Sequence, residues 1–127
     1  MRALSDAFSD AIVITEVGEH QILAARNFDF TAENQWITPG GFGTMGFGLG
    51  AAIGAAMAQP GRRILHLAGD GSFRMNCMEL ATVAAHQLPI TTIVFDNQKL
   101  GMVRTLSLIH IFIVHIKFGK SKNNFVE

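Results

Sequence analysis

Three short apolar runs constrain the fold of this 127-residue chain more than any other feature. They span residues 11–15, 63–68 and 90–95 and are rich in Ile, Val and Leu. Apolar runs of this length are typical of parallel strands that are buried on both faces. Helix-like segments separate them, and strands that alternate with helices predict an α/β fold, a doubly wound parallel sheet in three layers.

The segments between these runs predict the remaining elements. We expect helices at 20–27, 46–58 and 75–87, a short strand at 36–38, and a helix that opens near residue 100. Gly46, Gly50 and Gly54 follow at a spacing of four, which predicts a smooth stripe that another backbone can approach closely. Cys77 is expected to pack as a small hydrophobe, and His66 as a core histidine.

The charge balance and the single cysteine exclude several classes of protein. Lys and Arg number 10, and Asp and Glu number 10, so nothing favours nucleic acid or an anionic membrane surface as a partner. A lone cysteine excludes an internal disulfide and agrees with a cytoplasmic location. Residues 34–61 carry no charge, but Pro39 and clustered glycines favour a loop before a buried helix over a membrane span.

Polar side chains follow two of the predicted strands. Asp70 stands between two glycines after the run at 63–68, and Asn97 follows the run at 90–95. A right-handed crossover brings both strand ends to one edge of the sheet, so these side chains should lean over one point. Carboxylate and amide oxygens are ligands that Mg²⁺ takes, together with ligand phosphates. The alternative is that Asp70-Gly71 and Asp96-Asn97 each form only a turn.

Residues 69–97 resemble the fingerprint of thiamine diphosphate enzymes, in which a GDG sequence precedes a paired-Asn position. Further segments are similar to acetolactate synthase catalytic subunits and follow in the same order. They are VGEHQ at 17–21, GTMGFGL at 43–49, GDGSF at 69–73, ELAT at 79–82 and LGMVR at 100–104. The resemblance implies a thiamine diphosphate-binding fold, of which this chain holds part of one domain.

The resemblance also implies roles for individual residues. It makes Asp70, Asn97 and the backbone carbonyl of Lys99 ligands of Mg²⁺. The implied diphosphate contacts are Gly18, Glu19, His20, Gly71 and Ser72. Glu19 stands where the family usually has Gln, which places a carboxylate near the diphosphate.

The same resemblance implies that three further residues contact the organic part of the cofactor. Met45 is implied as the catalytic bulky residue that keeps thiamine diphosphate bent. Gly43 is implied to contact the aminopyrimidine through its backbone. Met102 is implied to line the cleft for cofactor and substrate, beside Val103.

The function implied is that of acetolactate synthase, a transferase of branched-chain amino acid biosynthesis. It decarboxylates pyruvate and condenses the product with a second 2-oxoacid, pyruvate or 2-oxobutanoate. The implied cofactors are thiamine diphosphate, Mg²⁺ and, in the parent enzyme, FAD. The implied partners are the missing domains, a second catalytic subunit in a homodimer or tetramer, and a regulatory subunit. Because the cofactor-activating glutamate lies on another domain, the chain alone is expected to be inactive.

The likeness stops before the end of the chain. We expect residues 1–105 to form an incomplete diphosphate- and magnesium-binding domain, and residues 106–127 to be an atypical tail. Alternatives are another thiamine diphosphate-dependent decarboxylase or carboligase, and a non-catalytic fragment. Gly41, Gly43 and Gly46 also fit a dinucleotide fingerprint, but that motif needs a clear strand before its first glycine.

Overall fold

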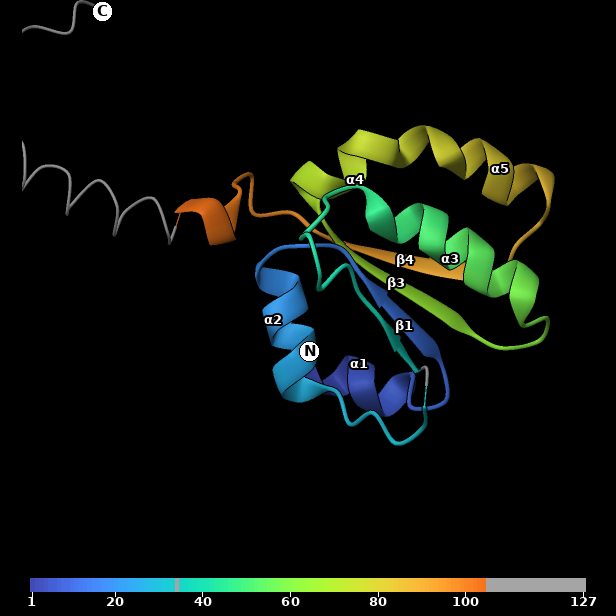
Figure 1. Ribbon diagram of the computed structural model, residues 1–127. Coiled ribbons are helices and arrows are strands. Elements are labelled where there is room, and N and C mark those ends of the chain that lie inside the picture. The colour runs from blue at the N-terminus through green and yellow to red at the C-terminus, as the bar shows by residue number, and fades with distance from the viewer. Residues whose placement is uncertain (34, 105–127) are drawn as a thin grey trace, which may run out of the picture.

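The computed structural model describes residues 1–33 and 35–104, which form four strands flanked by helices (Figure 1). The predicted tail and the boundary at residue 105 lie outside the described residues. In chain order the elements are α1 (Arg2–Ala7), β1 (Ile12–Thr15), α2 (Glu19–Asn27), β2 (Trp36–Ile37), α3 (Phe47–Ala58), β3 (Ile64–Gly69), α4 (Asp70–Asn76), the 3-10 helix η1 (Cys77–Glu79), α5 (Leu80–Ala85) and β4 (Ile90–Phe95). Residues 101–104 begin a further helical turn.

All four strands are parallel, in the order β2-β1-β3-β4. Thr15 at the end of β1 pairs with Leu67, and Gly69 at the end of β3 pairs with Phe95 at the end of β4. The second and third apolar runs therefore form neighbouring strands, and the prediction that both end at one edge of the sheet is confirmed. Every residue of β1 is buried, whereas β4 is only partly buried because it lies at the edge of the described sheet.

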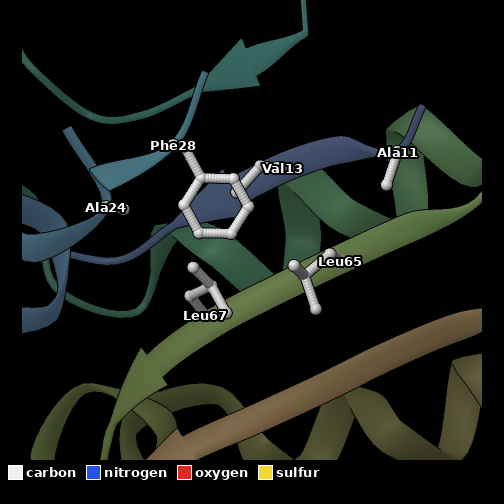
Figure 2. Packing of buried hydrophobic residues seen from close by; sticks show 6 residues of the cluster. All are labelled: Ala11, Val13, Ala24, Phe28, Leu65 and Leu67. Atoms are coloured by element: carbon white, nitrogen blue, oxygen red, sulfur yellow. The ribbon is translucent and has the colours of Figure 1, made fainter. Parts of the chain in front are cut away.

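Helices cover both faces of the sheet, so the predicted three-layer α/β fold is confirmed (Figure 1). On one face, Val13, Leu65 and Leu67 pack against Ala24 and Phe28 from the α2 region (Figure 2). On the other face, Ile12, Ile14 and Ile64 pack against Ala52 and Ala56 of α3. Successive side chains along each strand point to opposite faces of the pleated sheet and therefore pack into two separate cores, one on each face.

The expected helix at 75–87 was wrong in its bounds. Helix α4 already begins at Asp70, directly where β3 ends, and a 3-10 turn at Cys77–Glu79 separates it from α5, which ends at Ala85. Asp70 therefore lies in the first helical turn, where a carboxylate is favourable beside unpaired backbone N–H groups. Helix α1 was not predicted from the sequence.

Two packing predictions were wrong in this chain. Among residues 1–33 and 35–104, nothing lies within 4 Å of a Cβ atom built on Gly50 or Gly54, and these residues closely approach only Gly46 of the predicted stripe. Cys77 is exposed rather than packed. His66 is confirmed as a core histidine, with 0% of its surface exposed. In the described part of the chain, no helix has both the length and the apolar character needed to cross a membrane.

Candidate cofactor site

A cleft of about 320 Å³ lies at the carboxyl ends of β1, β3 and β4. Helix α2, which follows β1, packs on one face of the sheet, whereas α4, which follows β3, contacts α3 on the other face (Figure 1). The chain therefore leaves neighbouring strands β1 and β3 in opposite directions. In open α/β sheets such a switch point is where ligands bind.

The cleft brings together all but one of the residues that were predicted for the site. Those that line it are Gly18, Glu19, His20, Met45, Asp70, Gly71, Ser72, Asn97, Lys99, Met102 and Val103. Gly43 does not line it; a Cβ atom built there would lie 3.9 Å from Cγ2 of Val17, which does. Gly43 has φ +64, a left-handed conformation that favours glycine at this position.

The candidate metal ligands stand at the same level of the sheet because Gly69 and Phe95 are paired across β3 and β4. Asp70 follows Gly69, and Asn97 comes two residues after Phe95. Oδ1 of Asn97 accepts a hydrogen bond from the Lys99 backbone N–H at 3.0 Å, which fixes the turn between them. Among residues 1–33 and 35–104, no group of three or more His, Cys, Asp or Glu could hold a metal ion. The candidate set is of another kind: one carboxylate, one amide oxygen and one backbone carbonyl, all hard oxygens that suit Mg²⁺.

Glu19 lies over the loop that carries Asn97. Its Oε2 accepts a hydrogen bond from Nδ2 of Asn97 at 3.3 Å. A Cβ atom built on Gly101 would collide with the Glu19 carboxylate, so the glycine lets the loop pass close beneath it. The carboxylate that replaces the usual Gln is therefore engaged by the 97–101 loop.

His20 is buried in the cleft wall, with 4% of its surface exposed, and its ring stacks on Phe95. Its Nε2 is buried and, among the described residues, has no hydrogen-bond partner. A buried imidazole nitrogen without a partner is costly, so this atom is a ready contact for a ligand group. Burial lowers the pKa of His20 from its ordinary 6.5; the Glu16 carboxylate and a hydrogen bond to the Glu16 backbone oppose that shift.

This lowered pKa predicts a loss of stability in mild acid. Below about pH 6.5 the unfolded chain protonates His20 before the folded chain does, so the free energy of unfolding should fall as the pH falls toward the folded pKa. Urea unfolding between pH 7.5 and 5.5 measures this slope. We expect His20→Gln to flatten it, and His86→Gln, at an exposed histidine, to leave it unchanged. Equal slopes in the wild type and His20→Gln would contradict the prediction.

The first turn of α4 forms the opposite wall of the cleft. A Cβ atom built on Gly71 would lie 2.7 Å from Cδ2 of Leu100, so the glycine permits this close contact. The Ser72 hydroxyl donates to the Gly69 carbonyl at 3.2 Å. A hydroxyl carries one hydrogen, so in this conformation the Ser72 side chain offers a ligand an acceptor and no donor.

Glu16, to which no function was assigned from the sequence, is buried directly behind the cleft with 1% of its surface exposed. Its two carboxylate oxygens accept hydrogen bonds from the backbone N–H groups of Gly46 (2.9 Å) and Gly48 (2.8 Å), at the start of α3. The only sequence signal for this role is an acidic residue placed directly after a buried strand. Its partners lie about thirty residues away, beyond the reach of any local pattern.

Comparison with known proteins identifies the family to which this chain belongs. Residues 16–125 match the model of the C-terminal TPP-binding domain of thiamine pyrophosphate enzymes. A Mycobacterium smegmatis protein assigned provisionally as a thiamin diphosphate-dependent enzyme superposes with a TM-score of 0.69 at 29% identity, over 76% of this chain and 19% of that one. The chain belongs to the thiamine pyrophosphate enzyme family.

Acetolactate synthases are among its close relatives in sequence. The isozyme 2 large subunit of Escherichia coli is 49% identical over 105 residues, which are 82% of this chain and 19% of the relative. Chloroplastic acetolactate synthase 2 of Brassica napus is 49% identical over 102 residues, 79% of this chain and 16% of the relative. The chain thus spans about a fifth of the length of these relatives.

Proposed function

We propose that this chain is the diphosphate- and magnesium-binding part of an acetolactate synthase. The parent reaction decarboxylates pyruvate and condenses the product with a second 2-oxoacid, pyruvate or 2-oxobutanoate, in branched-chain amino acid biosynthesis. The names of relatives at 49% identity support this reaction. The observation that carries the cofactor assignment is the convergence of Asp70, Asn97 and His20 on one cleft.

The residues of the cleft fit a magnesium diphosphate. Asp70, Asn97 and the Lys99 carbonyl would hold Mg²⁺ through oxygen. Gly18 and His20 from the β1–α2 side, and the backbone N–H groups of Gly71 and Ser72 in the first turn of α4, would hold the diphosphate between them. Glu19 would act on this group indirectly, since its carboxylate accepts a hydrogen bond from Nδ2 of Asn97. The Asn97 oxygen already accepts the Lys99 N–H and would offer its second lone pair to the cation.

The remaining residues would meet the organic part of the cofactor. Met45, Met102 and Val103 line the apolar part of the cleft and would exclude water from the thiazolium ring. Gly43 would reach the aminopyrimidine through its backbone, from the loop that precedes Met45. Bound thiamine diphosphate supplies the stabilisation of a carbanion after decarboxylation.

The whole enzyme would need more than this chain. A glutamate that activates the aminopyrimidine, the FAD site and the rest of the subunit would come from the missing domains. A second catalytic subunit, a regulatory subunit and a cytoplasmic location belong to the same proposal. The chain by itself would bind cofactor without turning over pyruvate.

Calorimetric titration of the purified full chain in Mg²⁺ tests this proposal. We expect thiamine diphosphate to bind and inorganic diphosphate to compete with it, because the cleft holds the diphosphate end. Thiamine without phosphates should not compete, and NAD should not bind. Binding of NAD, or equal binding of thiamine and thiamine diphosphate, would contradict the assignment and favour another ligand class.

A further inference from the structure

Gly46 is held by side chains on both of its polar groups. Its N–H donates to Oε2 of Glu16 at 2.9 Å, and its carbonyl accepts a hydrogen bond from the Asn76 side-chain amide. Glu16 comes from the end of β1, whereas Asn76 is the last residue of α4. Two elements of the cleft wall thus meet at one residue of the loop between β2 and α3.

Glu16 has little freedom to release Gly46. A buried carboxylate is costly unless it is hydrogen-bonded, and both of its oxygens are occupied by N–H groups at the start of α3. These N–H groups have no partner within the helix and carry its positive partial charge, which favours the carboxylate. Nε2 of His66 lies 3.5 Å from Oε1 of Glu16 and is fully buried, so the carboxylate is enclosed on that side as well.

The two hydrogen bonds that hold Gly46 also determine where Met45 lies. Gly46 has φ +83, a left-handed conformation that reverses the chain between the loop and α3. Met45 stands directly before this reversal and lines the cleft, where its methyl carbon lies 3.7 Å from the Cβ position of Gly71. Asn76 and Gly71 belong to the same helix, so Asn76 ties the Met45 loop to the helix that begins with Asp70.

We propose that Glu16 and Asn76 are positioning residues that set the place of Met45 in the cleft by holding Gly46 from its two sides. The consequence for ligand binding rests on the proposed function, since it requires that Met45 supports the organic part of thiamine diphosphate. The placement of Met45 does not depend on that function. The two parts are therefore tested separately.

The placement is tested without cofactor. Methyl groups of methionine are labelled with ¹³C in the full chain, and Met45→Leu identifies the Met45 signal. We expect Asn76→Ala to shift and broaden this signal, because its exposed side chain can be removed without opening the core. Asn27→Ala is the matched control, since Asn27 also donates to a backbone carbonyl, that of Leu23, away from the cleft. An unchanged Met45 signal in Asn76→Ala would overturn the placement.

Glu16→Gln provides a second perturbation of Gly46. It removes the charge and keeps one acceptor oxygen, so one of the two N–H groups at the start of α3 loses its partner. We expect it to move the same Met45 signal, whereas Glu79→Gln, whose carboxylate accepts from Thr82, should not. If Glu16→Gln folds and leaves Met45 unmoved, Glu16 only caps the helix and is not a positioning residue.

The effect on ligand is tested by titration. In Asn76→Ala we expect the dissociation constant of thiamine diphosphate to rise by at least about threefold and that of inorganic diphosphate to stay unchanged. The rise should disappear in a Met45→Ala background, because the effect passes through Met45. An equal loss for both ligands, or a loss that persists without Met45, would overturn the proposal. Failure of the wild type to bind thiamine diphosphate would instead contradict the proposed function alone.

Discussion

Asp70→Asn is expected to weaken the binding of thiamine diphosphate in Mg²⁺ by more than about 100-fold. Residues that only orient a metal ligand typically account for about 10- to 100-fold in affinity, so the loss of a direct carboxylate ligand should exceed that range. The substitution keeps the shape of the side chain and its place in the first turn of α4. The expected cause is therefore the lost charge and not a lost fold.

Asp96→Asn is the matched control for this prediction. Asp96 also lines the cleft and follows the adjacent strand, but its Oδ1 accepts the Gln98 N–H at 3.1 Å. We expect less than a tenfold change, because Asp96 is not a ligand in the proposed site. Calorimetry on both variants gives the comparison. Equal losses would show that the cleft responds only to its total charge, and Asp70 would then have no special role.

Gly48→Ala is expected to lower the free energy of unfolding by about 3 kcal/mol, at the upper end of what overpacking a core usually costs. The added Cβ atom would lie 2.6 Å from Nε2 of His66 and 2.9 Å from Oε1 of Glu16. Both side chains are fully buried, so neither can give way without opening the core. The same atom would push Glu16 off the start of α3.

Gly50→Ala, two residues further along α3, should raise the free energy of unfolding instead of lowering it. A Cβ atom there would meet nothing within 4 Å, so the substitution should add about 0.5–1 kcal/mol through better helix propensity. Urea unfolding followed by circular dichroism measures both variants. If the two differ by less than about 1 kcal/mol, the crowding behind the cleft is not as tight as these distances require.

The parallel strands and their shared edge could be predicted because each depends on local pattern and on the handedness of the crossover. The runs that form β1 and β3 are apolar on both faces, and the residues after β3 and β4 must then lie at one edge. This reasoning from the residues alone is enough to place Asp70 and Asn97 in one cleft. The resemblance contributed His20, Met45 and Met102, all of which line it.

What could not be predicted depends on contacts between distant segments. Gly71 disfavours a helix locally, so the start of α4 was placed too late; in the structure this glycine permits the close contact with Leu100. Glu16 was given no role, because its partners are N–H groups 30 and 32 residues away in the sequence. The glycine stripe of α3 was wrong at Gly50 and Gly54, because spacing reveals a shared face but not whether anything lies on it.

The most direct test of the proposed cofactor site is the wild-type titration with thiamine diphosphate, carried out once in Mg²⁺ and once in EDTA. We expect one cofactor to bind per chain in Mg²⁺ and binding to be lost in EDTA, because Asp70 and the diphosphate would repel each other without the cation between them. Binding of equal strength in both conditions would contradict a magnesium diphosphate site at the ends of β3 and β4.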